Sequence, residues 1–316
     1  MTSRAFRLNS ELVVAAILSA AVLAGLGFGW LYSGTSFTDA RHYLLEGPVQ
    51  YLVIAPFFFL VGLELKRELT HGDLKPLRNL LPPLFGAILG VAFPAAWYLL
   101  LTAGTPAASG WPIPTATDVT FALAAFQVLG RSLPRAARTF LLAFAVIDDL
   151  IAVVLITLVF GLQGANGFVE LIPVLVAFVT PTRWIRRFES WLLKYLNFFG
   201  LPVFAFLISA VRLPGAEVLA SVVFWAVIGR SAWKWLGVYL GGRIGGIWAS
   251  GEMRLPNRVL LAVSSLGGIG FTVAMLVSQL ALGARPVEFA AAISATFAAS
   301  AVSLLLGRWL LRSAQG

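Results

Sequence analysis

The sequence predicts an all-α polytopic membrane protein, with about ten transmembrane helices in two inverted five-helix halves whose interrupted helices cross at the midplane. Three observations predict this class: the composition, the distribution of basic residues and a matching break in each half. Of the 316 residues, 59% are hydrophobic and 12% are charged, whereas soluble domains are nearer half apolar and a quarter charged. This composition excludes an ordinary soluble enzyme and a disordered protein.

Hydropathy divides the chain into ten apolar segments, most of them close to the roughly 20 residues that a membrane-spanning helix needs. The segments are 12–32, 48–65, 79–101, 113–130, 137–163, 168–181, 191–211, 215–240, 257–281 and 286–311. We treat residues 1–316 as a single membrane transport domain, with a first half over 1–163 and a second half over 168–316. The core helices of the halves are expected at about 79–163 and 215–311.

Basic residues determine the predicted orientation. Most of the 23 Lys and Arg residues fall on the side that holds both chain termini, whereas Arg41, Arg212 and Arg285 fall on the opposite side. Because positively charged loops are retained in the cytoplasm, both termini of this multi-pass protein are predicted to be cytoplasmic. The same bias explains the net charge of +9 without nucleic acid, and the composition implies the lipid bilayer as a partner.

Each half contains an interrupted helix at a corresponding position. Residues 110–118 read GWPIPTATD and residues 267–272 read GGIGFT, and their prolines and glycines can leave the helical ladder. Irregular backbone at membrane depth is tolerated only where it is buried in protein or lines a cavity. Because matching breaks in inverted repeats are typical of secondary transporters, they predict a binding site at their crossing. Two kinked helices are the plainer alternative.

Two adjacent aspartates, Asp148 and Asp149, lie near the centre of the fifth segment, in AFAVIDDLIAVVL. A single Asp at a helix centre costs about 2.5–3.5 kcal/mol on insertion scales, so an adjacent pair requires a reason. Burial and a like-charged neighbour both favour the neutral form of a carboxyl group, so such a pair can hold a proton and exchange it for a cation. The alternative is a buried pair that only joins two helices.

Asp118 ends the first break, directly after Thr117. An aspartate at this position can cap the following half-helix, whose N-terminus carries partial positive charge. We expect Asp118 to do so and also to shape the site. The Thr117 hydroxyl offers a neutral oxygen to a hard cation.

Two basic residues lie within the eighth segment. Arg230 is near its middle, and because deep arginines are almost always paired, we expect it to pair with one of the three intramembrane aspartates. Lys234 is flanked by two tryptophans and is expected to extend to the cytoplasmic interface, which requires no functional role. Glu64 and Glu189 lie at predicted cytoplasmic helix ends, where they form either solvated helix ends or a proton-sensing rim.

Motifs for other chemistry are not recognisable in the sequence. The chain has no Cys and two His, His42 and His71, so a thiolate nucleophile, a disulfide and a His-rich metal site are not expected. Residues 267–270 superficially resemble a phosphate-binding loop, but no strand precedes them. We therefore expect no enzyme activity and no cofactor.

Five motifs, in order, resemble those of the NhaA-type sodium/proton antiporter family. They are FFFLVGLELKREL (57–69), GWPIPTATDVTFAL (110–123), FLLAFAVIDDL (140–150), LPVFAF (201–206) and GGIGFT (267–272). The family is an established example of inverted-repeat architecture. The resemblance covers nearly the whole chain and implies export of sodium or lithium ions in exchange for protons, by alternating access, in a bacterial inner membrane.

The resemblance also implies roles for individual residues. Asp149 would be the main ion ligand, with Asp148 as its partner. Thr117 and Asp118 would belong to the broken helix beside the site. The resemblance places Glu64 and Glu189 in a pH-responsive cytoplasmic funnel. A homodimer is the protein partner that the resemblance implies.

The chain departs from the family by its length. Only 40 positions separate Asp149 from Glu189, so a pair of helices between the two halves is inferred to be missing. Because those helices belong to the panel beside the mobile core, their loss would affect dimer contacts and the rigidity of the panel.

A second departure concerns Arg230. The family typically has Lys in the corresponding helix, and the matching position here is read as Arg230. A guanidinium stays protonated in proteins, whereas a buried ammonium can deprotonate. If Arg230 pairs with Asp148, that carboxylate stays ionised and Asp149 alone exchanges one proton for one Na⁺, which is electroneutral and is the outcome we favour. If both carboxylates titrate instead, two protons exchange for one Na⁺.

Two other functions remain as alternatives. A transporter of the same architecture could carry an organic solute, although tandem aspartates disfavour an anion. A shortened relative could also serve as a transport-inactive membrane scaffold, although the three intact aspartates disfavour that role.

Overall fold

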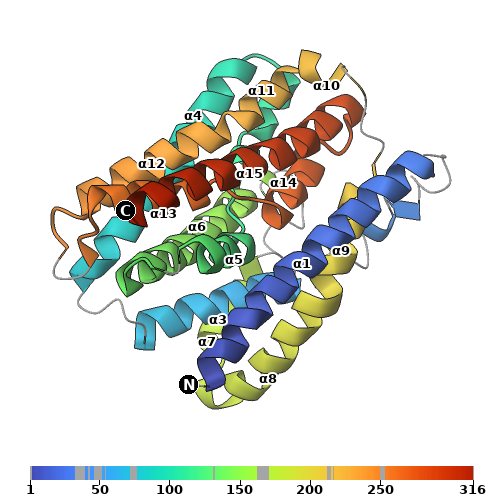
Figure 1. Ribbon diagram of the computed structural model, residues 1–316. Coiled ribbons are helices and arrows are strands. Elements are labelled where there is room, and N and C mark those ends of the chain that lie inside the picture. The colour runs from blue at the N-terminus through green and yellow to red at the C-terminus, as the bar shows by residue number, and fades with distance from the viewer. Residues whose placement is uncertain are drawn as a thin grey trace. The chain divides into compact units, whose positions relative to one another are not determined.

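A computed structural model describes residues 2–32, 40–41, 43–45, 52–53, 55–71, 77–130, 132–161, 171–211, 215, 217–249 and 253–315. These residues form helices joined by short connections, and the described part of the chain contains no strand (Figure 1). The chain divides into two compact units, one of residues 1–67 and 153–215 and one of residues 68–152 and 216–316. The second unit therefore combines residues from both predicted halves.

The first unit is built on α1 and α9. Its helices are α1 (Thr2–Leu31), most of α3 (Ala55–His71), the end of α6 (Arg135–Gly161), α7 (Leu171–Val179), α8 (Thr182–Tyr195), the π-helical turn η5 (Leu196–Gly200) and α9 (Leu201–Ser209). Helices α1 and α9 lie side by side (Figure 1). A Cβ at Gly25 would meet the carbonyl oxygen of Phe206, so the absence of a side chain permits this contact.

The second unit holds both interrupted helices. Its elements are η2 (Leu77–Leu80), α4 (Leu81–Thr102), η3 (Pro106–Gly110), η4 (Ile113–Thr115), α5 (Val119–Leu129), most of α6, α10 (Glu217–Ala220), α11 (Val222–Ile228), α12 (Arg230–Gly245), α13 (Asn257–Leu266), α14 (Thr272–Leu282) and α15 (Pro286–Gln315). Buried side chains of α5, α6 and α13 form its apolar core around Phe140 and Phe144, both fully buried.

Helix α12 packs along α4 through a glycine seam, which consists of Gly237, Gly241 and Gly245 (Figure 1). A Cβ at any of the three would meet a backbone carbonyl of α4. Small residues at four-residue spacing are typical of close helix packing in membranes. Lys234 and Arg230 lie three and seven residues before the first glycine of the seam, so they share its buried face.

Both predicted interruptions are confirmed. In the first, η4 ends at Thr115 and α5 begins at Val119; in the second, α13 ends at Leu266 and α14 begins at Thr272. The half-helices α5, α13 and α14 contain 11, 10 and 11 residues. At about 1.5 Å per residue, each reaches only about half of the 30 Å hydrocarbon core.

The predicted helix 215–240 is not continuous in the structure. It is divided into α10, α11 and α12, with Gly229 between α11 and α12. A Cβ at Gly229 would meet the indole of Trp97 on α4, and Trp97 Nε1 lies 3.5 Å from the carbonyl oxygen of Trp225. Packing of a large aromatic side chain against the glycine therefore accompanies the interruption.

Within the described residues, four helical stretches have the length and apolar composition to cross a membrane. They are Leu12–Leu31, Arg78–Thr102, Phe188–Ser209 and Pro286–Ser313. These coincide with the first, third, seventh and last segments expected from hydropathy. The expected segments 48–65 and 168–181 lie partly outside the described residues.

Candidate functional site

Asp118 joins the two breaks of the second unit. It precedes α5, and its Oδ1 accepts a hydrogen bond from the Phe121 N–H at 3.4 Å, so it caps this helix as predicted. Its Oδ2 accepts bonds from the N–H and the hydroxyl of Thr272, the first residue of α14, at 3.3 and 2.9 Å. The Asp118 N–H donates to the Ile269 carbonyl at 2.8 Å. One buried carboxylate therefore compensates the positive N-terminal ends of two half-helices.

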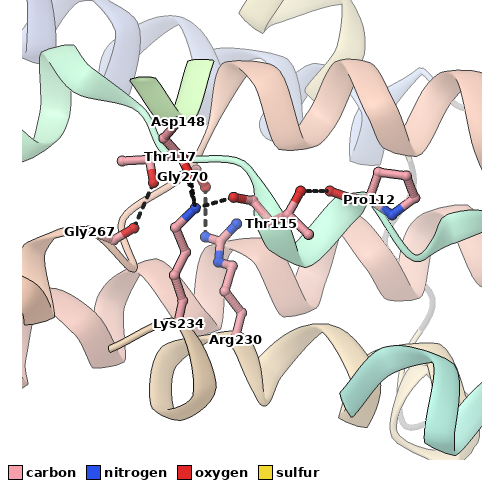
Figure 2. Close-up of polar contacts among 8 residues, drawn as sticks. All are labelled: Pro112, Thr115, Thr117, Asp148, Arg230, Lys234, Gly267 and Gly270. Atoms are coloured by element: carbon pink, nitrogen blue, oxygen red, sulfur yellow. Dashed lines mark hydrogen bonds and ion pairs between the residues drawn. The ribbon is translucent and has the colours of Figure 1, made fainter. Parts of the chain in front are cut away.

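Lys234 and Asp148 form a buried ion pair (Figure 2). Lys234 Nζ lies 2.8 Å from Oδ2 and 3.0 Å from Oδ1 of Asp148, and both side chains are 0% exposed. The same Nζ donates to the carbonyl oxygen of Thr115, where η4 ends. The ammonium therefore lies between a carboxylate of α6 and a backbone carbonyl of the first break.

Lys234 does not extend to the cytoplasmic interface, so this prediction was wrong. The close approach of α12 to α4 turns the face with Lys234 into the protein, where the side chain contacts Asp148. The four-residue spacing of Gly237, Gly241 and Gly245 was the sequence signal for this buried face, because Lys234 is one helical turn before it.

Arg230 is also fully buried, but it has no carboxylate partner in the described part of the chain (Figure 2). Its Nη2 donates to the Gly270 carbonyl and to Ser300 Oγ, both at 3.0 Å. Among the described residues, its Nε and Nη1 have no hydrogen-bond partner. The expected pairing of Arg230 with an aspartate is therefore incorrect, and Lys234 rather than Arg230 occupies the place of the basic residue beside Asp148.

Thr117 connects the first break with the second. Its hydroxyl donates to the Gly267 carbonyl at 2.8 Å, and the residue lies next to Asp148 (Figure 2). A hydroxyl that donates one hydrogen bond keeps its lone pairs for a cation. Asp149, 8% exposed, follows Asp148 on α6 and points about 100° further around the helix.

The structure divides the six acidic and basic candidates between the two units. Asp118, Asp148, Asp149 and Arg230 belong to the second unit, as does Thr117. Glu64 and Glu189 belong to the first unit. Glu189 is partly buried on α8, and the side chain of Glu64 lies outside the described residues. Their role in a pH-responsive rim stays a prediction.

The donor set of the second unit suits a transported alkali cation. Over the described residues, no group of three or more His, Cys, Asp or Glu is placed to hold a metal ion. Two adjacent carboxylates, a hydroxyl and the carbonyls of two breaks supply hard oxygen ligands. Buried charges beside interrupted helices are typical of secondary transporters.

Comparison with known proteins identifies the family. The Na⁺/H⁺ antiporter 1 family model matches residues 32–165 and 167–311. The chain is 34% identical to the Na⁺/H⁺ antiporter NhaA 2 of Clavibacter michiganensis, over 76% of this chain and 71% of that protein. It is 32% identical to the Na⁺/H⁺ antiporter NhaA of Aliivibrio fischeri, over 90% of each chain. It is also 32% identical to NhaA of Frankia casuarinae, over 82% of this chain and 73% of that protein. The chain belongs to the Na⁺/H⁺ antiporter 1 family, and the NhaA resemblance is confirmed.

Proposed function

We propose that this chain exports Na⁺ or Li⁺ in exchange for protons by alternating access, with Asp148, Asp149 and Thr117 binding the cation. The observation that supports this most is the buried ion pair of Lys234 with Asp148. A metal cation that binds Asp148 must displace the ammonium or cause it to lose its proton. Ion binding and proton binding then compete at one site, as antiport requires.

The identity of the basic residue beside Asp148 changes the expected stoichiometry. A buried Lys can deprotonate, whereas Arg cannot. When Na⁺ binds, Lys234 and Asp149 can each release one proton while Asp148 stays ionised. Two protons then exchange for one Na⁺, and transport moves net charge. This replaces the one-for-one expectation, which depended on Arg230 being the partner of Asp148.

The proposal includes an architecture of two inverted halves in a bacterial inner membrane, with both termini cytoplasmic and a homodimer as the assembly. The distribution of basic residues supports the orientation, and the two breaks support the inverted halves. The homodimer rests on the family resemblance alone. The two matched segments of the family model meet between residues 165 and 167. That position falls within the stretch where a pair of family helices is inferred to be missing.

Proton flux in everted membrane vesicles tests the function. On addition of Na⁺ or Li⁺, the unsubstituted protein is expected to collapse an imposed pH gradient, and Asp149→Asn is expected to abolish this response while still inserting. Asparagine keeps the shape of the side chain but cannot ionise, so it can neither release a proton nor neutralise the cation. Glu288→Gln, a carboxyl change at the start of α15 outside the site, is the matched control.

The outcome also separates the alternatives. A pH response to an organic solute but not to Na⁺, Li⁺ or K⁺ would indicate the solute transporter, and no response to any would indicate the scaffold. Normal exchange by Asp149→Asn would disprove the assignment of Asp149. In reconstituted vesicles, a rate of exchange that does not change with an imposed membrane potential would contradict the two-proton stoichiometry.

A further inference from the structure

We propose that the second unit binds one anionic phospholipid in a cavity where α12 connects to α13, with Arg243 and Arg254 holding the phosphate of its headgroup. The cavity lies within the second unit, and none of the residues that line it belongs to the ion pair or to either break. The inference therefore goes beyond ion exchange and does not depend on it.

The cavity has a volume of about 60 Å³, whereas one water needs about 10–15 Å³. Its lining combines buried apolar side chains, such as Phe140 of α6 and Leu260 of α13, with the exposed Arg243 and Arg254. Because the arginines are exposed and the apolar residues are buried, the positive charge lies where a ligand would enter. The cavity can therefore receive a small anionic group from outside the protein.

The positive charge at the cavity is not compensated within the described part of the chain. Arg243 Nη1 donates to Oδ1 of Asn257, a neutral amide, and the other donors of this guanidinium remain for a ligand. Neither Arg243 nor Arg254 forms an ion pair with a described residue. Helix α13 also begins here, after Pro256, which provides no side-chain cap, so its N-terminus adds partial positive charge.

Apolar side chains lie exposed beside these arginines, on the last turn of α12 and just after it. Ile244, Ile247 and Trp248 are 39%, 66% and 53% exposed, and Ile247 also lines the cavity. The Trp248 ring stacks on Phe85 of α4, with ring centroids 6.0 Å apart. Tryptophan side chains held in this way are typical of the boundary between lipid and water.

The combination of charge and apolar surface identifies a lipid as the occupant. A free phosphate would satisfy the arginines but would leave Ile247 and Trp248 exposed, whereas the acyl chains of a lipid would cover them. Basic pockets between membrane helices on the cytoplasmic side are typical sites for anionic headgroups. The proposed orientation places this connection on that side. Since the cavity exists only in the folded protein, lipid binding is expected to stabilise the second unit.

Titration of the purified protein in a neutral detergent with phosphatidylglycerol tests the site. Native mass spectrometry is expected to detect one bound lipid, and thermal unfolding is expected to move to higher temperature. Arg243→Gln and Arg254→Gln should each weaken binding about fivefold, which corresponds to about 1 kcal/mol for one basic residue at a membrane surface. Arg243→Lys and Arg254→Lys keep the charge and should retain most of the affinity.

Two further variants separate a defined site from general attraction to a basic protein. Arg308→Gln combined with Arg312→Gln removes two exposed charges from α15 and should leave the affinity for one lipid nearly unchanged. Gly246→Leu fills the cavity and keeps both arginines, so it should weaken binding. A Cβ at Gly246 would lie nearest to the backbone oxygens of Gly242 and Arg243, at 3.0 and 3.3 Å.

Unchanged lipid binding in Arg243→Gln and Arg254→Gln, or an equal loss in the α15 double variant, would overturn the inference. Equal stabilisation by inorganic phosphate would show that a small anion suffices, and equal stabilisation by phosphatidylcholine would show that net negative charge is not required; either would overturn the assignment to an anionic lipid. If Arg243→Gln does not fold, Arg254→Gln alone decides, because Arg254 is exposed.

Discussion

The two breaks of the second unit differ in how their helix ends are compensated. The first break contains its own charged cap, because Asp118 precedes α5 and accepts a hydrogen bond from its first turn. At the second break, α14 follows Phe271, which provides no side-chain cap. Thr272 at the N-terminus of α14 donates to Asp118 instead. The Gly267 carbonyl accepts a hydrogen bond from Thr117, and the Gly270 carbonyl accepts one from Arg230.

This difference makes the second break dependent on residues elsewhere in the chain. Its backbone supplies the carbonyl oxygens and the helix N-terminus, whereas the first break, α6 and α12 supply the charged side chains. Substitutions in the first break are therefore expected to disturb the structure of the second break as well. Changes confined to side chains of the second break are expected to stay local.

Removal of Lys234 is expected to have the largest effect. Lys234→Ala leaves Asp148 buried without its cation, which typically costs about 3–5 kcal/mol, and it also leaves the Thr115 carbonyl without its donor. Thermal unfolding of the purified protein should show this loss, and exchange should be abolished. The deficit should become smaller as pH falls, because Asp148 can then be protonated. Lys194→Ala, at an exposed position on α8, is the control; equal stability of both variants at alkaline pH would contradict the ion pair.

Asp118→Ala is expected to have the next largest effect and tests the comparison directly. It removes the acceptor of the Phe121 N–H and of both Thr272 donors, and each buried donor left without a partner costs about 1–3 kcal/mol. Hydrogen exchange should increase in the first turns of both α5 and α14. If only α5 loses protection, the second break does not depend on the first.

Two isosteric hydroxyl deletions are expected to have the smallest effects. Thr117→Val and Thr272→Val each remove one hydrogen bond, at a cost of about 1 kcal/mol in unfolding free energy. Only Thr117→Val should also weaken Na⁺ binding, because only Thr117 lies beside Asp148. Calorimetric titration with Na⁺ distinguishes the two, and equal affinities would remove Thr117 from the ion site.

The acidic part of the site was predictable from local sequence. Asp148 and Asp149 in an apolar segment are too costly to be incidental, and prolines and glycines indicated both breaks. The capping role of Asp118 on α5 also followed from its position. Its bonds to Thr272 did not, because they depend on the approach of two segments 154 positions apart.

The basic part was predicted incorrectly because pairing depends on which face of a helix is buried. Two flanking tryptophans suggested that Lys234 reaches an interface, whereas the glycines later in the same helix determine its orientation. The partners of Arg230 are a backbone carbonyl and a serine, and neither leaves a recognisable pattern. The number of spans, the inverted halves and the roles of Glu64 and Glu189 stay predictions.

The glycine seam has a consequence for how this chain can vary by mutation. Every single-nucleotide missense change of a glycine codon introduces a residue with at least a Cβ atom. At Gly237, Gly241 and Gly245 that atom would meet a backbone carbonyl of α4, which cannot rotate away as a side chain can. No single-nucleotide missense change at these three codons therefore introduces a residue that the close contact with α4 can accommodate. Gly27 of α1, where a Cβ would meet no atom within 4 Å, lacks this constraint, so a library of random variants should retain substitutions there and lose them at four-residue intervals along α12.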